Sequence, residues 1–123
     1  MVKEFHLDIS RDNPLYGVPH DFLIWFIGFM EGDGSYFVSG GRVYFVIVQK
    51  EKAILEYIQR TLGFGNIFKH GNYWRLELGD PKVLHALLML LNGNLVLGKR
   101  FHQLRVVIEA FNLRYLNLPI DFI

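Results

Sequence analysis

Two carboxylates, Glu31 and Asp33, stand among glycines at the end of the apolar stretch FLIWFIGFMEGDG, Phe22–Gly34. The run of apolar residues and glycine before them predicts a helix that protein covers on nearly every side. A carboxylate at a helix C-terminus faces the negative end of the macrodipole, so a bound cation would explain it. A solvated carboxylate that begins a turn at Asp33 is the ordinary alternative. This helix end is therefore a candidate cation site that needs support from the rest of the chain.

Gly28 and Gly32 are four residues apart, so they share one face of this helix, and Trp25 lies one turn earlier on the same stripe. Glycine in a helix interior costs roughly 1 kcal/mol relative to alanine. Close approach of a second backbone is one compensation for that cost. The spacing therefore predicts a helix–helix contact.

Composition excludes several classes of protein. Hydrophobic residues make up 51% of the 123-residue chain and charged residues 20%, so the chain is apolar for its size and part of its surface is expected to be covered by a partner. The net charge of +1 is too small to indicate nucleic-acid binding by itself. The absence of cysteine excludes disulfides, thiolate metal sites and a cysteine nucleophile. The longest apolar run is about half of the roughly 20 residues of a membrane span, and an intracellular soluble domain is expected.

The remaining chain alternates between helical and strand periodicity. Asp21 is expected to cap the first helix, and the pairs Gly40-Gly41 and Gly71-Asn72 each predict a β-hairpin. The predicted order after the first helix is strands Ser35–Ser39 and Arg42–Gln49, helix Glu51–Leu62, strands Asn66–His70 and Tyr73–Leu78, a helix from Pro81 to about Asn92 and a helix from about Lys99 to Phe111.

This order predicts an α+β domain with a four-stranded, mostly antiparallel sheet and helices on one of its faces. The domain is placed at residues 21–112. Residues 1–20 are expected to form an irregular N-terminal arm, and residues 113–123 a C-terminal tail or interdomain linker. The second face of the sheet is left open.

Strand alternation assigns one set of side chains to that open face. Its polar members could meet base edges and phosphates in a DNA major groove, with an ordinary solvated sheet face as an equal alternative. Its apolar members argue against a fully polar reading surface. The set is Ser35, Phe37 and Ser39; Arg42, Tyr44, Val46 and Val48; Asn66, Phe68 and His70; Tyr73, Arg75 and Glu77.

Two further sites stand out. Gln49 ends the second strand close to where the first strand leaves Asp33. Lys99-Arg100 follows Gly98 at a predicted helix N-terminus, where a cation is disfavoured unless an anion such as phosphate is nearby. A solvated pair is the alternative for Lys99-Arg100.

Five segments resemble, in order, those of the LAGLIDADG homing endonuclease family, a resemblance that covers most of the chain. They are FIGFMEGDG at Phe26–Gly34, FVIVQKE at Phe45–Glu51, TLGFGNI at Thr61–Ile67, YWRLEL at Tyr73–Leu78 and NGNLVLGKR at Asn92–Arg100.

The resemblance implies an αββαββα fold and a DNA endonuclease that uses Mg²⁺ or another divalent cation. Asp33 matches the metal ligand of the motif, and the backbone carbonyl of Gly32 is a second candidate ligand. Gln49 and Lys99 match positions that organise solvent and offset charge on the phosphate, so the catalytic residues are expected to be Asp33, Gln49 and Lys99. No role is assigned to Glu31.

The resemblance also implies two partners, double-stranded DNA and a second LAGLIDADG helix, and no membrane. The helix contact is expected at Trp25, Gly28, Phe29 and Gly32. The residues expected to contact DNA are Ser35, Phe37, Ser39, Arg42, Tyr44, Val46, Asn66, Phe68, His70, Tyr73, Arg75, Glu77 and Arg100.

A single motif supplies a single catalytic carboxylate, so the chain is expected either to form a homodimer or to be half of a single-chain enzyme. An intracellular, organellar (mitochondrial) origin is expected from the resemblance alone. Two alternatives remain open. The same fold could serve as an intron maturase or DNA-binding regulator without cutting, or the chain could be a non-catalytic dimerisation or assembly domain.

Overall fold

The computed structural model describes residues 9, 11–94, 98–115 and 119–121 of the chain, and its elements follow the predicted order. Strands β2, β3 and β4 have the predicted bounds, and β1 begins one residue earlier, directly after Asp33. The elements are α1 (His20–Asp33), β1 (Gly34–Ser39), β2 (Arg42–Gln49), α2 (Lys52–Leu62), β3 (Asn66–His70), β4 (Tyr73–Leu78), α3 (Pro81–Leu91) and α4 (Gly98–Arg114).

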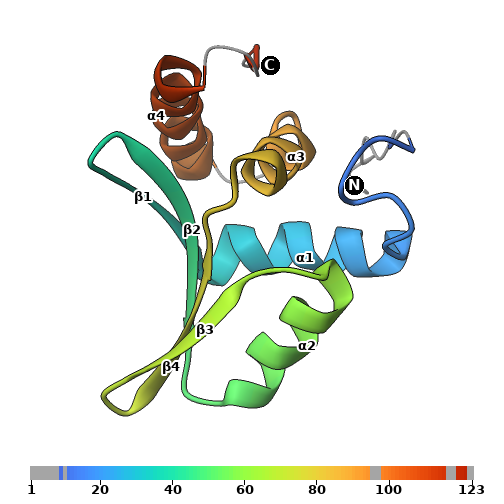
Figure 1. The fold of residues 1–123 in the computed structure, drawn as a ribbon, viewed down its shortest axis with the longest axis vertical. Helices are drawn as coiled ribbons and strands as arrows, with labels where there is room; N and C mark the ends of the chain where they lie inside the picture. Colours follow the sequence, from blue (N-terminus) through green and yellow to red (C-terminus); the bar gives the residue numbers. More distant parts are fainter. Residues whose placement is uncertain (1–8, 10, 95–97, 116–118, 122–123) are drawn as a thin grey trace.

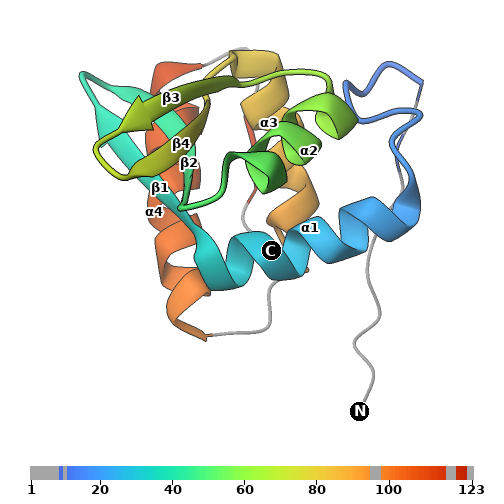
Figure 2. The ribbon, with the colours of Figure 1, turned by 90° about the horizontal axis from the view of Figure 1, so that it is seen from below.

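The four strands form one antiparallel sheet in the order β1-β2-β4-β3. All four helices lie on the same side of this sheet, and no described segment covers its other face (Figure 1 and Figure 2). The α+β fold class and the open face are therefore confirmed.

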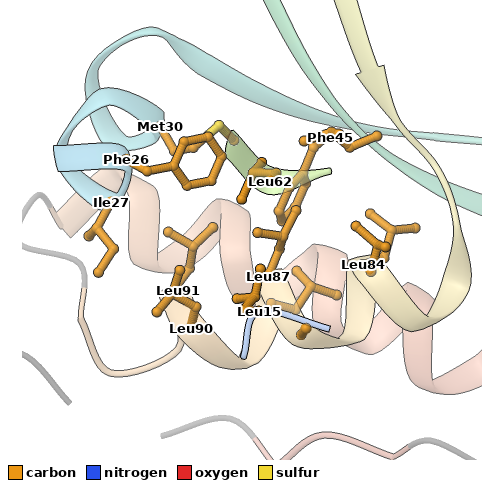
Figure 3. Packing of buried hydrophobic residues seen from close by; sticks show 14 of the residues in the cluster. Leu15, Phe26, Ile27, Met30, Phe45, Leu62, Leu84, Leu87, Leu90 and Leu91 are labelled. Carbon is orange, nitrogen blue, oxygen red and sulfur yellow. The ribbon is translucent and has the colours of Figure 1, made fainter. Parts of the chain in front are cut away.

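The core fills the space between the sheet and the helices. Alternate residues of β2, namely Val43, Phe45 and Ile47, point into it, and α3 packs on them through an almost continuous set of leucines (Figure 3). The N-terminal arm also contributes, because Leu15 is only 1% exposed and lies among the α3 leucines. The arm is irregular as predicted, and its turn places a hydrophobic side chain in the core.

The start of α1 differs from the prediction. The helix begins at His20 and Pro19 occupies the capping position, so Asp21 is not the cap. Asp21 lies instead in the first turn, where its carboxylate faces the positive end of the helix dipole. The predicted cap of α3 is correct, since the Asp80 carboxylate accepts from the backbone N–H groups of Lys82 and Val83.

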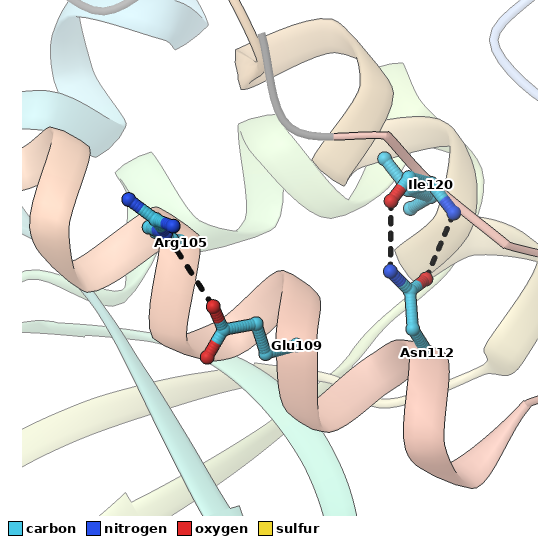
Figure 4. Close-up of polar contacts among 4 residues, drawn as sticks. All are labelled: Arg105, Glu109, Asn112 and Ile120. Atoms are coloured by element: carbon cyan, nitrogen blue, oxygen red, sulfur yellow. Dashed lines mark hydrogen bonds and ion pairs between the residues drawn. The ribbon is translucent and has the colours of Figure 1, made fainter.

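The C-terminal tail was predicted to begin at residue 113, but α4 continues to Arg114. The described residues after it pack back on the domain. The Asn112 amide donates to the Ile120 carbonyl at 2.7 Å and accepts from its N–H at 2.8 Å, as a paired strand would (Figure 4). Asn92 donates to the carbonyl of Asp121. These contacts were not predicted from the sequence, because sequence patterns do not reveal such long-range amide contacts.

Within the described part of the chain, every helix is too short or too polar to cross a bilayer.

Candidate functional site

The two carboxylates at the end of α1 have different environments. Glu31 is only 8% exposed and belongs to the buried side of the helix, whereas Asp33, the last helical residue, is exposed. The adjoining Gly34 begins β1 so close to α1 that a β-carbon there would lie 2.6 Å from Cε of Met30. Asp33 is therefore held at a fixed junction between helix and sheet, and it is the carboxylate available to solvent.

Gln49 lies at the same end of the sheet as Asp33. Gly34 pairs with Ile47, so Asp33, one residue before Gly34, and Gln49, two residues after Ile47, lie at the same end of these paired strands. Gln49 is half-buried opposite Trp74 and borders a surface hollow of about 530 Å³. This arrangement gives its amide room to contact water.

Lys99 and Arg100 fall in the first turn of α4, which confirms that they lie at a helix N-terminus. Their side chains are outside the described part of the chain. Their predicted roles in charge compensation and DNA contact stay predictions.

Among the described residues, no three histidine, cysteine, aspartate or glutamate side chains come together as a metal cluster. Asp33 with the neighbouring Gly32 carbonyl offers oxygen donors of the kind that Mg²⁺ prefers, but one copy offers too few for a complete site. The donor chemistry fits a divalent cation if a second carboxylate comes from elsewhere.

No described residue covers the outward side of α1. Trp25 is 38% exposed, Gly28 and Gly32 are exposed, and a β-carbon built on either glycine meets no heavy atom within 4 Å. Phe29 is half-buried, with its ring 5.0 Å from that of Trp25. The described residues of one copy therefore cover only part of the helix, and cover of the glycine-bearing side by a second copy stays a prediction.

Two residues of this surface were missed by sequence reasoning. Ile24 is exposed beside Trp25, and Tyr57 of α2 contacts Trp25 with ring centroids 5.8 Å apart. Phe22 joins both rings, at 5.6 Å from Trp25 and 5.5 Å from Tyr57. The i, i+4 spacing from Gly28 back to Ile24 could have identified the isoleucine, whereas Tyr57 required the packing of α2 on α1. We call Ile24, Trp25, Gly28, Phe29, Gly32 and Tyr57 the α1 face.

The strand register places the predicted sheet residues together on the open face, because residues opposite each other in neighbouring strands share a face. This surface is called the open sheet face below. Its cross-strand pairs and rows are Ser39 with Arg42, Phe37 with Tyr44, Ser35 with Val46, Glu77 and Asn66, Val48 with Arg75 and Phe68, and Tyr73 with His70.

Val46 corrects one prediction on this face. It points to the open side but is only 4% exposed, so it has almost no surface with which to contact DNA. Its neighbours in register are Ser35 and Glu77, and the Arg75 side chain reaches across the sheet toward Phe37. The long polar and aromatic side chains around Val46 cover it, which strand alternation alone does not reveal.

Cations on the open sheet face are held by rings and by one carboxylate. The Arg75 guanidinium carbon lies 5.2 Å from the Phe37 ring centroid, Phe37 stacks on Tyr44 at 4.8 Å, and Arg42 lies 5.6 Å from the Tyr44 ring. Nε of Arg75 also lies 3.1 Å from Oε1 of Glu77. We call Arg42, Tyr44, Phe37 and Arg75 the arginine–aromatic row.

A lysine cluster at the end of the sheet was not predicted as a DNA contact. Lys52 and Lys69 place their ammonium groups 4.6 and 5.9 Å from the ring centroid of Trp74, and Lys50 lies 5.9 Å from Tyr73. All three lysines are exposed, with Glu51 as the neighbouring carboxylate in sequence. Lys50 lies in the β2–α2 connection, Lys52 begins α2 and Lys69 belongs to β3, so only the fold brings them together. The pair Lys69 and Trp74 alternates with the pairs of the open sheet face, so it lies on the helix side of the sheet.

Comparison with known proteins places this arrangement in context. No family model matches the chain. A curated relative from Neurospora crassa (strain ATCC 24698 / 74-OR23-1A / CBS 708.71 / DSM 1257 / FGSC 987), "Probable intron-encoded endonuclease 4", is 38% identical over 105 residues. The match covers 80% of this chain, and the chain spans about a fifth (19%) of the relative's length.

The structure is similar to that of the archaeal intron-encoded homing endonuclease I-Vdi141I complexed with DNA, with a TM-score of 0.66 and 26% identity over 80% of this chain and 72% of the other. For the LAGLIDADG meganuclease I-AabMI bound to uncleaved DNA, the TM-score is 0.65 and the identity 22%, over 77% of this chain and 38% of the other. For the homing endonuclease I-CvuI, in a DNA complex with 2 mM Mg in which the DNA is not cleaved, the TM-score is 0.60 and the identity 22%, over 74% of this chain and 66% of the other. The last two likenesses support the fold alone.

The motif FIGFMEGDG, the strand order and the exposed Asp33 at the end of an uncovered helix agree with these comparisons. The chain therefore has the fold of the LAGLIDADG homing endonucleases and is similar in sequence to an intron-encoded endonuclease.

Proposed function

We propose that this chain is the DNA-cleaving domain of a site-specific homing endonuclease, and that it hydrolyses double-stranded DNA after pairing with a second copy through the α1 face. A divalent cation, Mg²⁺ in the first instance, is the proposed cofactor. The DNA complexes of structural neighbours and the name of the curated relative support the proposal.

One observation carries the pairing. The open side of α1 leads directly to the exposed Asp33, so a second α1 packed along this side in the same direction, with the C-terminal ends together, would bring a second Asp33 to the same place. In a twofold-symmetric dimer both copies use the same surface patch, so each contact of the interface occurs twice, once in each direction. Pairing would therefore supply the carboxylate that a single copy lacks.

The proposed chemistry rests on four residues and a divalent cation. When bound, the cation would supply an activated water and stabilise charge on the phosphate oxygens. The Asp33 carboxylate and the Gly32 carbonyl would hold the cation, and the Gln49 amide, which both donates and accepts, would orient the attacking water. Lys99 offsets the negative charge that develops at the phosphate.

DNA binding is proposed for the open sheet face, including Arg100 at the adjoining helix start. A β-sheet surface with arginine, asparagine and histidine side chains can meet base edges in the major groove. Because the curated relative is described as intron-encoded, we propose an intracellular, organellar (mitochondrial) origin for this chain as well.

The test begins with the solution mass of the purified chain, for which we expect twice 14.4 kDa. The chain is then incubated with Mg²⁺ and a plasmid library carrying randomised inserts, and both strands should be cut at a recurrent, near-palindromic site. EDTA should abolish cutting. A monomer that cuts nothing, even when a second LAGLIDADG domain is supplied, would contradict the proposal.

A further inference from the structure

The guanidinium of Arg75 is constrained from two sides. Its carbon lies 5.2 Å from the Phe37 ring centroid, and its Nε lies 3.1 Å from Oε1 of Glu77. Phe37 is supported in turn by Tyr44, which stacks on it with ring planes 15° apart. The side chain of Arg75 is 30% exposed and that of Glu77 27%, so both are partly shielded from water.

This constraint selects which donors remain for a further partner. Nε is buried beside Glu77, with which it forms an ion pair but no hydrogen bond, so the two terminal nitrogens of the fork are the N–H donors left for a partner. A parallel pair of donors matches two acceptors side by side. In duplex DNA, O6 and N7 of guanine present such a pair in the major groove.

The position of Arg75 favours a base edge over the phosphate backbone. It lies on β4, one of the two central strands, and faces the open side between Val48 and Phe68 of the flanking strands. The lysine cluster, by contrast, lies at the end of the sheet and its lysines are exposed. If the middle of the sheet enters the groove, a side chain on a central strand lies closest to the base edges, where the contacts that carry sequence information are made.

We propose that Arg75 determines specificity by reading a guanine, and that Glu77 and Phe37 are positioning residues that hold its guanidinium ready for this contact. The inference rests on the proposed function, because it requires the open sheet face to lie in the DNA groove. Fixing the side chain before binding reduces the entropy lost when the contact forms.

The test is a binding selection from fully randomised duplex DNA in the presence of Ca²⁺, with the intact chain and sequencing of the bound pool. The original chain should select a site with a fixed guanine. Arg75→Lys should lower the preference for guanine at that position by about 10-fold or more, which is the scale of one bidentate contact, and leave the other positions unchanged.

Two further variants test the positioning role. Glu77→Gln keeps the shape of the side chain but removes its charge, and Phe37→Leu removes the ring. Each should lower the guanine preference at the same position by a few-fold, with an unchanged melting temperature. Arg105→Lys and Glu109→Gln are matched controls, because Arg105 and Glu109 form an exposed ion pair at 3.4 Å on α4. They should leave the selected site unaltered.

The outcomes separate this inference from the proposed function. If the original chain selects no sequence, the proposed function itself fails. If it selects a site and Arg75→Lys weakens binding equally at all positions, Arg75 contacts phosphate and the inference is overturned. If Arg75→Lys relaxes one position but Glu77→Gln and Phe37→Leu do not, the positioning roles are wrong.

Discussion

The molecule leaves two surfaces uncovered by its own helices, and they differ in chemistry. The α1 face consists of rings, an isoleucine and glycines, and its exposed carboxylates, Asp21 and Asp33, lie at the two ends of the helix. The open sheet face carries arginines held by rings and by Glu77. The uncharged middle of the α1 face, with its small residues, suits close packing against a second apolar helix. The arginines of the open sheet face suit binding to a polyanion such as DNA. The two surfaces should therefore respond to different substitutions.

We expect the largest effect, on the cleavage rate, from substitution of Asp33 at the C-terminal end of the α1 face. Asp33→Asn should lower the cleavage rate by about 1,000-fold or more, on the scale of losing one electrostatic stabiliser of the transition state. Dimer mass and DNA binding should be retained, as measured by light scattering and gel shift. Asp21→Asn, at the opposite end of the same helix, is the matched control and should cut normally. If Asp33→Asn cut DNA at the wild-type rate, the proposal that Asp33 holds the metal would be wrong.

The next effect tests shape on the α1 face. Gly28→Leu should weaken dimerisation on the order of 100-fold, because overpacking costs about 1–3 kcal/mol at each of two symmetric positions. The monomer should fold at least as well, since nothing lies within 4 Å of the new β-carbon and glycine is a poor helix former. Ala53→Leu on the exposed side of α2 serves as control. A Gly28→Leu dimer of unchanged affinity would show that the helices do not meet here.

DNA binding by the open sheet face should depend on charge, and therefore on salt concentration, rather than on side-chain volume. Lys50→Gln, which removes the ammonium beside Tyr73 of the open sheet face, should reduce the slope of log binding constant against log salt by about 0.9, the value for one phosphate contact, with the selected sequence unchanged. Lys82→Gln, an exposed lysine of α3, should have no such effect. A change of base preference in Lys50→Gln would mean that Lys50 reads a base, and the division of roles between it and Arg75 would disappear.

The smallest expected effect is on the pH dependence of stability, and it concerns His85, which is part of neither surface. Burial against the helices lowers the pKa of His85, whose ring lies 6.0 Å from that of Phe111. Because the unfolded chain then binds the proton more readily, this residue favours folding above its unfolded pKa of about 6.5 and loses that contribution as the pH falls below it. Urea unfolding of His85→Gln should show a slightly weaker decline of stability in acid than the original chain. His102→Gln, exposed on α4, should behave as the original; equal declines in all three proteins would contradict the assignment.

Local signals were sufficient for most of the fold. Turn glycines, hydrophobic periodicity and the Asp80-Pro81 start located every strand and helix within a few residues. One error was local, because α1 begins at His20 with Pro19 in the capping position that was predicted for Asp21. The packing of Ile120 and Asp121 on the domain was missed for another reason, because it depends on contacts with Asn112 and Asn92 that are distant in sequence.

The candidate site was predictable to the same degree. Alternation gave the correct face for the sheet residues, because strand period is a property of the backbone. Alternation could not reveal that Val46 is covered, that Glu31 is buried while Asp33 is exposed, or that three lysines from two segments surround Trp74 and Tyr73. Those facts depend on how side chains from different elements pack. The roles of Gln49 and Lys99 stay predictions.

The direct passage of α1 into β1 has a consequence for how cutting relates to recognition. Asp33 ends the helix and Gly34 begins the strand, with no intervening loop and with Met30 packed against the junction. In the proposed endonuclease, the distance between the bases that are read and the bond that is cut is therefore set by covalent geometry. A residue inserted at this junction would turn every side chain of β1 to the opposite face, so new target sequences must arise by substitution on the open sheet face, while the cutting position remains constant.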